Sequence, residues 1–372
     1  MDLVPLLQAL VRIDSTSSRP NGHVLDLLEG ELKGRGFTFQ RSAWIDDHGV
    51  PKENLVCRRG PDRPGGLMLL GHTDCVPFAA EWAEALSGVE RDGCIHGRGS
   101  ADTKGFLSAA VTAACRTRAG KQPLTLLFTA DEEVGCLGAK QALAEGRVKP
   151  HHAIVGEPTG LVPVRAHKGY CAVEVELTGL EGHSAYPGLG ASAIHAAGRL
   201  FPELERIGTL LEAQPDPDFD PPHATWNVGV IHGGKARNIL AGSCRFTYEW
   251  RPLPGRDPRH ALRLLEAACQ RLTEDSGGRI KHAISPMEFD AAAVTAPGAE
   301  IVRFLEAESG HRATTVPFGT ELPEVADMGA EGVVFGPGDI RVAHRTGEHV
   351  QVAELVRAAE ILARAIVHFC AA

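Results

Sequence analysis

PLTLLFTADEE, residues 123–133, joins a run of apolar side chains directly to three consecutive carboxylates, Asp131, Glu132 and Glu133. A continuous apolar run of this length is typical of a strand that is buried on both faces of a parallel sheet. Neighbouring carboxylates repel one another and raise each other's pKa. Their position at the end of a buried strand therefore predicts that positive charge lies beside them.

Three other segments have the same design, in which an apolar run is followed by glycine or a turn and then by histidine or an acid. These segments are GLMLLGHTD (66–74), HAIVGEPT (152–159) and GVVFGPGDIRVAH (332–344). Helical patterns separate the runs, notably at residues 104–118. The alternation predicts an α/β domain with a mostly parallel, mixed sheet flanked by helices. Sites in such sheets form outside the carboxyl ends of the strands, so the polar segments are expected to meet at one edge.

The middle of the chain has a different pattern. Four segments alternate apolar and polar residues: CAVEVELTG (171–179), TWNVGV (225–230), CRFTYEWRPLPG (244–255) and RIKHAIS (279–285). This period is typical of antiparallel strands with one solvated face, and helical patterns lie between them. We therefore expect an α+β two-layer satellite domain at residues 165–285, inserted into an α/β domain formed by residues 1–164 and 286–372.

The overall composition narrows the possible partners. The formal net charge is −9 and no block of Lys or Arg is present. We therefore expect neither nucleic acid nor an anionic membrane as a partner. A small metabolite is the expected partner. No stretch reaches ~18 uncharged apolar residues, which predicts that no segment spans a membrane. The length of 372 residues favours about two domains.

The cysteines and the N-terminal stretch both bear on location. Nine cysteines, scattered and without a C-x-x-C pair, indicate reduced thiols rather than a disulfide framework. MDLVPLLQALVRIDSTS (1–17) has apolar residues at helical spacing and lacks a basic start or an A-x-A-like cleavage site, which predicts a surface helix rather than a signal peptide. We therefore expect a cytoplasmic protein.

Several of the candidate polar residues have ordinary structural explanations when taken singly. His72 and Asp74 in GHTD point to the same side of an extended strand end, but such a pair is common. Asp102 in HGRGSADTKG stands just before a helical pattern, where an acid caps the helix or interacts with its dipole. Glu157 precedes Pro158 in a turn, and His344 fits a surface position.

Together these residues indicate a metal site, because each lies where the sheet argument places a ligand. Their nitrogen and oxygen atoms, without a thiolate, suit Zn²⁺, Mn²⁺ or Co²⁺ in a carboxylate-bridged site, and two ions in such sites lie roughly 3.5–4 Å apart. Two divalent ions would supply the positive charge that the consecutive carboxylates require. One carboxylate would bind metal while its neighbour serves as a base for a bridging water.

Six motifs carry a resemblance to a known family: LLGHTDCVP (69–77), HGRGSADTKGFLSAA (96–110), FTADEEVGCLGAK (128–140), VGEPTG (155–160), HKGYCAVEVELTGLEGHSAYP (167–187) and FGPGDIRVAH (335–344). Nearly end to end, the chain resembles the M20 metallopeptidases, the group of the acetylornithine deacetylases, succinyl-diaminopimelate desuccinylases and related aminoacylases and carboxypeptidases. The resemblance implies a catalytic α/β domain with a smaller satellite domain, in agreement with the split expected above.

The resemblance also implies a set of metal ligands. By motif, His72 and Glu157 would hold one ion and Glu133 and His344 the other, and Asp102 would bridge the two.

Two further residues receive catalytic roles from the same resemblance. Glu132 would act as general acid/base, taking a proton from the attacking water and returning it to the leaving amine. Asp74 would orient His72, a contact that also raises the basicity of the ligand.

In the satellite domain the resemblance selects three residues. His183 in GHSAYP matches a histidine that stabilises the oxyanion, and donors of this kind are worth ~2.7–4 kcal/mol each. Arg251 in RPLPG matches an arginine that contacts the substrate carboxylate, for which its planar fork is suited. Asn238 matches a substrate-binding asparagine. Family members commonly pair through this domain, so a homodimer is expected, with His183 serving either its own site or its partner's.

The motifs DTKGF and DEEVGCLGA are closest to the acetylornithine deacetylase branch, and FGTELPEVAD (318–327) departs from it at Leu322 and Pro323. A cationic ornithine side chain would require a carboxylate such as Glu321, whereas the neutral ureido group of N-acetylcitrulline would require donors and acceptors. The expected activity is deacetylation of N-acetylornithine or N-acetylcitrulline, with release of acetate, in arginine biosynthesis. The alternatives are a desuccinylase, a dipeptidase or aminoacylase, and an inactive metal- or amino-acid-binding protein.

Overall fold

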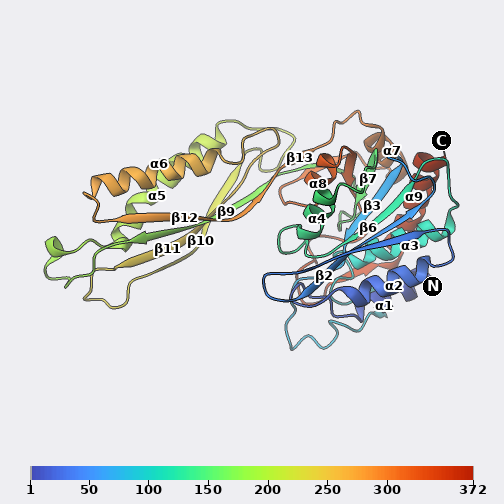
Figure 1. The fold of residues 1–372 in the computed structure, drawn as a ribbon, viewed down its shortest axis with the longest axis horizontal. Helices are drawn as coiled ribbons and strands as arrows, with labels where there is room; N and C mark the ends of the chain where they lie inside the picture. Colours follow the sequence, from blue (N-terminus) through green and yellow to red (C-terminus); the bar gives the residue numbers. More distant parts are fainter. Residues whose placement is uncertain (1, 372) are drawn as a thin grey trace. The chain divides into compact units, whose positions relative to one another are not determined.

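The computed structural model describes residues 2–371 and divides them into two compact units. Unit 1 contains the residues up to Arg165, Thr295–Thr314 and those from Thr320 onward, and unit 2 contains Ala166–Val294 and Thr315–Gly319. The chain passes from unit 1 into unit 2 within a single strand, β8 (Val164–His167). Figure 1 shows a sheet with flanking helices in each unit.

Unit 1 is built on a mixed sheet with the strand order β1-β2-β6-β3-β7-β15-β8, which continues to β13 of unit 2, and β14 also pairs with β8. The strands are β1 (Thr38–Ile45), β2 (Pro51–Arg59), β3 (Leu67–His72), β6 (Leu124–Thr129), β7 (His152–Val155), β13 (Ala293–Val294), β14 (Thr314–Val316) and β15 (Glu331–Val334). The four central strands, β6, β3, β7 and β15, run parallel. They are the four apolar runs of the sequence, and β3 and β6 are buried at every position.

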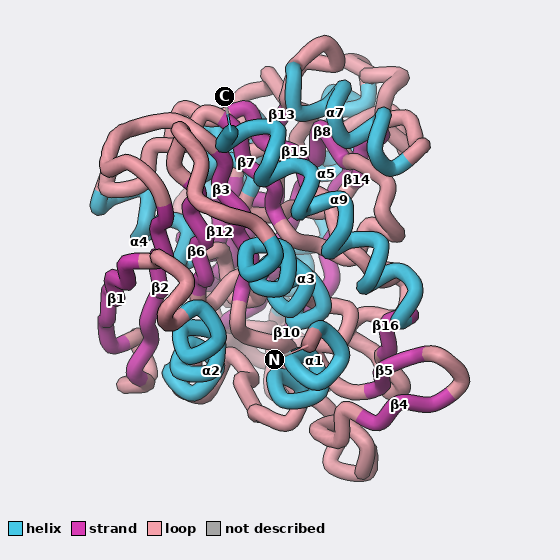
Figure 2. Tube along the Cα trace, turned by 90° about the vertical axis from the view of Figure 1, so that its right-hand side faces the viewer, coloured by secondary structure: helices cyan, strands magenta, loops and turns pink. Residues whose placement is uncertain are grey.

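Helices cover both faces of this sheet. The helices of unit 1 are α1 (Leu3–Val11), α2 (Gly22–Leu32), α3 (Lys104–Arg116), α4 (Leu137–Glu145), α7 (Glu300–Ser309), α8 (Leu322–Asp327) and α9 (Val352–Ala371). In Figures 1 and 2, α1, α3 and α9 lie together on one face, and α4 and α8 lie on the other in Figure 1. The apolar stripes of α1, α3 and α9 form the main core with the sheet. A small sheet of β4 (Val89–Arg91), β5 (Cys94–His96) and β16 (His349–Gln351) completes the unit.

Unit 2 is a two-layer structure in which two helices cover an antiparallel sheet. Its strands, in the order β10-β11-β9-β12, are β10 (Thr225–Gly233), β11 (Ser243–Arg251), β9 (Tyr170–Thr178) and β12 (Lys281–Asp290). Two helices, α5 (Ala193–Glu212) and α6 (His260–Asp275), pack on the sheet, and a 3₁₀ turn, η1, covers Pro187–Leu189. The alternation in β11 predicts the buried face, where Phe246, Tyr248 and Trp250 are each at most 1% exposed.

The predicted fold class is therefore confirmed, as an α/β unit with a mixed, centrally parallel sheet and a smaller α+β unit. The sequence placed one domain boundary at residues 285/286, and β12 continues past that point to Asp290. Among residues 2–371, none of the helices is both long enough and apolar enough to cross a membrane.

Candidate metal centre

The carboxyl ends of three neighbouring parallel strands bring the predicted ligands together. His72 is the last residue of β3 and is paired in register with Thr129, the last residue of β6. Glu132 and Glu133 follow β6, and Glu157 follows β7 after a single glycine. Because parallel strands end at the same edge, residues far apart in the sequence meet there.

Gly156 places Glu157 because it allows the chain to pass very close to a core ring. A Cβ atom at residue 156 would lie 2.0 Å from Cδ1 of Phe106, which is buried in α3. The same turn is tied to the segment before α3, since the hydroxyl of Thr103 donates to the carbonyl oxygen of Gly156 at 3.0 Å. This hydrogen bond couples the position of Glu157 to that of Asp102, because each acid is next in the chain to one of the two residues that it joins.

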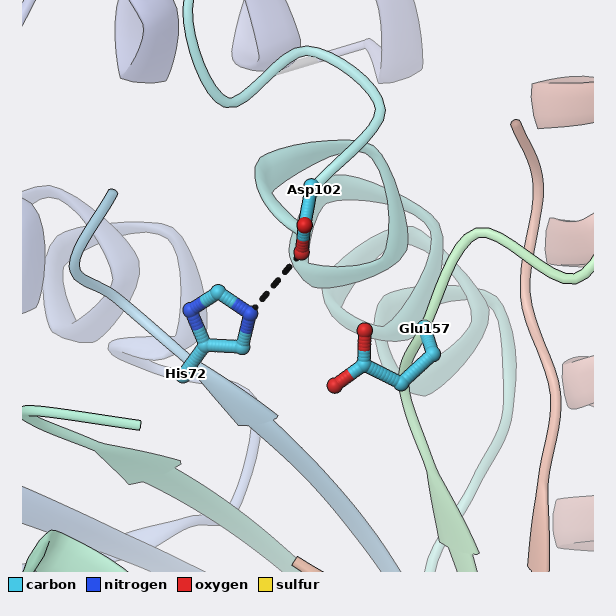
Figure 3. A group of neighbouring side chains, drawn as sticks. All are labelled: His72, Asp102 and Glu157. Carbon is cyan, nitrogen blue, oxygen red and sulfur yellow. Dashed lines mark hydrogen bonds and ion pairs between the residues drawn. The ribbon is translucent and has the colours of Figure 1, made fainter. Parts of the chain in front are cut away.

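Asp102 lies between two histidines and contacts one with each of its oxygens. Oδ1 is 3.1 Å from Nε2 of His72, and Oδ2 is 3.1 Å from Nε2 of His344. Figure 3 shows the contact with His72 and places Glu157 on the opposite side of the cluster. Glu133 completes the second half, with both carboxylate oxygens 3.1 Å from Nε2 of His344. A carboxylate that presents its two oxygens to two separate ligand sets has the geometry required of a bridge.

The ligand atoms form overlapping groups in which all atoms lie within 4.8 Å of one another: His72–Asp102–Glu157, His72–Glu132–Glu133 and Asp102–Glu133–His344. Within the described chain, Oε1 of Glu157 is buried without a hydrogen-bond partner, although buried polar atoms are normally paired. Nitrogen and oxygen donors around an unpaired buried carboxylate fit divalent cations. The residues present therefore fit a pair of such ions, and their chemistry does not select one metal.

The pKa values of the clustered side chains also fit a site for divalent cations. Burial raises the pKa of Glu132 and of Glu157 well above the usual value, because a desolvated carboxylate is costly to ionise. Burial acts on Asp102 in the same direction, but its hydrogen bonds to the two histidines hold its pKa below the usual range. Those contacts with carboxylates raise the pKa of His344 to about 10. The cluster places the carboxyl groups of Asp102, Glu132, Glu133 and Glu157 beside two histidines, and a bound cation would favour the ionised form of each acid.

Asp74 contacts His72 and also makes hydrogen bonds that the motifs did not predict. Nδ1 of His72 is 3.0 Å from the backbone oxygen of Asp74 and 3.6 Å from its carboxylate. The carboxylate also accepts the backbone N–H groups of Glu132 at 3.1 Å and Glu133 at 3.3 Å, and the hydroxyl of Ser17 at 2.8 Å. Asp74 therefore holds the segment that carries the two acids as well as contacting His72.

Lys52, in β2, supplies the positive charge beside the first of the consecutive carboxylates. Its Nζ is 2.6 Å from Oδ1 of Asp131 and also donates to the backbone oxygens of Ser17 and Arg19. The motif analysis did not select Lys52, because a lysine 79 residues away in the chain carries no local signal. Asp131 is therefore a structural acid, and the acids of the cluster begin at Glu132.

Glu348 is a second residue that the motif analysis did not identify. Its Oε1 accepts the backbone N–H groups of Ala101 at 3.0 Å and Asp102 at 3.1 Å, and its Oε2 accepts from Nη1 of Arg98 at 2.5 Å. Glu348 is fully buried. It fixes the backbone from which the Asp102 carboxylate projects.

Glu321 lies immediately before α8 and is fully buried. Burial raises its pKa to about 8, and its charge in turn contributes to the raised pKa of Glu132. Leu322 and Pro323, which depart from the family pattern, form the first turn of α8, where proline is well tolerated because the first N–H groups of a helix have no partner within it.

The three residues predicted in unit 2 lie at two different places. His183 and Asn238 are neighbours. The N–H of Ser184 donates to the backbone oxygen of Asn238 at 3.0 Å, and His183 forms an isolated antiparallel β-bridge with Ile239. Nδ1 of His183 accepts the N–H of Ala185 at 3.0 Å, which leaves the proton on Nε2 as a donor. Arg251 is the last residue of β11, where it pairs with Thr225 at the opposite end of the ladder, and its guanidinium is 4.7 Å from the ring centre of Tyr170.

A centrally parallel α/β sheet with a cluster of histidines and carboxylates at its carboxyl edge is the arrangement of a hydrolase. The chain belongs to peptidase family M20/M25/M40, since the model of that family matches residues 68–368. It is accordingly a hydrolytic enzyme of the class that acts on amide bonds.

Individual proteins are similar to this chain over its whole length. The acetylornithine deacetylase of Myxococcus xanthus is 50% identical, and the alignment covers 99% of both chains. A tripeptidase of Staphylococcus aureus has a TM-score of 0.79 with 20% identity, covering 99% of this chain and 98% of the other. A dinuclear metal-binding peptidase of family M20 from Bacillus subtilis has a TM-score of 0.66 with 14% identity, covering 99% and 97%. The two structures support the fold.

Proposed function

We propose that this protein hydrolyses the amide bond of N-acetyl-L-ornithine, releasing acetate and ornithine in arginine biosynthesis. One observation carries the proposal. Two histidines and two glutamates lie around Asp102, and Glu132 lies beside this group; the four are His72, Glu133, Glu157 and His344. The relative with 50% identity over both full chains supports the choice of substrate.

His72 and Glu157 would hold one divalent ion, Glu133 and His344 the other, and Asp102 would bridge them. We propose Zn²⁺ or Co²⁺, and Mn²⁺ suits the same donors. Bound ions of this kind supply Lewis acidity, which polarises a carbonyl and lowers the pKa of water toward ~7.

Glu132 would take a proton from the attacking water and return it to the departing amine. Its carboxylate belongs to the cluster with His72 and Glu133, and a base of raised pKa is suited to both transfers near neutral pH. Asp74 would keep Glu132 in place through the backbone N–H that it accepts at 3.1 Å. Arg251 and Asn238 would bind the substrate, Arg251 at its carboxylate, and His183 would donate to the developing oxyanion.

We further propose a cytoplasmic homodimer that pairs through unit 2. From Ser243 to Arg251 β11 spans roughly 26 Å, and backbone contacts at Gly179–Gly242 and His183–Ile239 continue the ladder beyond it. One copy of unit 2 therefore cannot bring His183 and Arg251 to the same small substrate.

A second copy would supply the missing group. The edge strand β10 and the loops near His183 expose large apolar side chains, as expected of a face that another chain covers. These side chains are Leu180, Tyr186, Leu189, Val230, Ile231 and Ile239. Sedimentation as a monomer at micromolar concentration would contradict the dimer but not the chemistry.

The activity is tested by kcat/KM of the Zn²⁺- or Co²⁺-loaded protein on N-acetyl-L-ornithine, N-acetyl-L-citrulline, N-succinyl-L,L-diaminopimelate and a dipeptide, measured as free amine. We expect acetylated substrates to be preferred, and chelation to abolish turnover reversibly. Preference for the succinyl donor would establish a desuccinylase instead. Absence of turnover on every substrate, with metal bound, would favour a binding protein.

A further inference from the structure

A cavity of about 840 Å³ in unit 1 opens directly beside the metal cluster. Glu133, one of the proposed ligands, forms part of its wall. The other walls come from the loop at residues 16–18, from the end of β1 and the turn that follows it, and from the beginning of α4. Figure 2 shows β1, β2 and α4 on the same side of the unit. A group held at the cluster would therefore have this space next to it.

Much of the cavity wall is apolar although it is open to solvent. Ile45 is 63% exposed, Val134 54% and Leu137 41%, and Trp44 is half-buried beside them. Large apolar side chains that gather around one cavity, rather than being scattered, mark a binding surface. They suit an aliphatic chain of a few methylene groups.

The charged groups in the wall are mostly acidic, and all but one are engaged. Asp131 pairs with Lys52 at 2.6 Å. Asp46 accepts the N–H groups of His48 and Val50, each at 2.8 Å.

The remaining acid lies at the tip of the turn between β1 and β2. Asp47 is exposed and has no hydrogen bond or ion pair within residues 2–371. The single ammonium group in the wall, that of Lys140, donates to the backbone oxygen of Gly135 at 2.8 Å. The cavity therefore has one carboxylate available for a cationic ligand.

We propose that this cavity holds the side chain of the substrate and that Asp47 pairs with its terminal ammonium group. The inference rests on the proposed function, which places the amide bond at the metal cluster. The apolar wall would cover the methylene stem, and Asp47 would recognise the positive charge at its end. The site is then built for an N-acetylated diamino acid such as N-acetylornithine, and the neutral ureido group of N-acetylcitrulline gains nothing from the carboxylate.

The test compares Asp47→Asn with the unchanged protein on N-acetyl-L-ornithine and on N-acetyl-L-norvaline, which has the same stem without the amine. Loss of a charge-assisted hydrogen bond should lower kcat/KM for acetylornithine about tenfold, and kcat/KM for acetylnorvaline should stay within about twofold of the unchanged protein. Trp44→Ala should instead lower both values in parallel, because the stem is common to both substrates.

Asp62→Asn is the matched control, since it removes one charge from a 93% exposed carboxylate beyond the other end of β2, and it should change neither value. If the unchanged protein hydrolyses acetylornithine but Asp47→Asn leaves the ratio of the two substrates unaltered, the side-chain site is wrong and the proposed function stands. If the unchanged protein does not hydrolyse acetylornithine, the proposed function itself fails.

Discussion

Lys52 Nζ lies 2.6 Å from Oδ1 of Asp131, and the two side chains are only 1% and 2% exposed. A buried ion pair is costly to break because either partner left alone is a desolvated charge. This pair also joins two parts of the metal centre, since Nζ donates to the backbone oxygen of Ser17 while the Ser17 hydroxyl donates to Asp74.

Replacing only one partner of this pair should therefore be much worse than replacing both. Lys52→Met should lower the free energy of unfolding by about 3–5 kcal/mol, because Asp131 would remain buried and unpaired. The double variant Lys52→Met, Asp131→Asn should recover most of that loss. Urea unfolding of the unchanged protein and of the two variants checks this, and equal midpoints for the single and double variants would contradict the prediction that an unpaired Asp131 carboxylate causes the loss.

Glu348 contacts the backbone of Asp102 and not the ligand atoms of the proposed metal centre. Glu348→Ala removes the acceptor of the N–H groups of Ala101 and Asp102, so the bridging carboxylate should be less well oriented. Such outer contacts typically contribute 10–100-fold in metal affinity. Competition with a chromophoric chelator should show a loss of that size, and unchanged affinity would mean that the backbone before α3 holds Asp102 unaided.

The spacing of apolar residues along the sequence predicted much of this architecture. The four central strands follow from continuous apolar runs, because they are buried on both faces, and α3, α5 and α6 follow from apolar residues at helical spacing. The spacing did not predict the two charged side chains that hold the site together, Lys52 and Glu348. Lys52 and Glu348 act through contacts with residues 79 and 246 positions away, and a single sequence gives no signal for a contact between distant segments.

The role of Asp74 shows a second limit. Spacing within GHTD placed its side chain near His72, where it lies 3.6 Å from Nδ1, but did not predict that the carboxylate also accepts the backbone N–H groups of Glu132 and Glu133. Which donors a carboxylate accepts depends on loop backbone geometry, and Asp131 has a positive φ of 58°. A pattern of residue types does not encode that turn.

The two carboxylates Glu132 and Glu157 should be separable by experiment. Glu132→Gln removes a proton carrier and should lower kcat by at least about 10²–10⁴-fold while the metal content stays the same. Glu157→Gln removes a proposed ligand whose Oε1 has no other partner in the described chain, and should reduce the bound metal. Elemental analysis beside steady-state kinetics distinguishes them. Loss of metal in both variants would make Glu132 a ligand instead of a base.

His167 in unit 2 should make stability depend on pH. Burial lowers the pKa of His167 from 6.5 to about 4, and its Nδ1 is 2.7 Å from the backbone oxygen of Lys168, so the neutral ring donates there. The unfolded chain binds a proton at higher pH than the folded one does. This contribution is therefore fully present above pH ~6.5 and is lost as pH falls toward ~4, at a cost of roughly 3 kcal/mol.

His167→Asn keeps a donor near the position of Nδ1 and removes the titration. Urea unfolding of this variant and of the unchanged protein between pH 7.5 and pH 4 measures the difference between their free energies of unfolding, in which every other titrating group cancels. We expect a constant offset above pH ~6.5, from the smaller side chain, and a difference that moves in favour of the variant by roughly 3 kcal/mol on acidification. A difference that does not change with pH would mean that His167 is protonated equally in the folded and unfolded states.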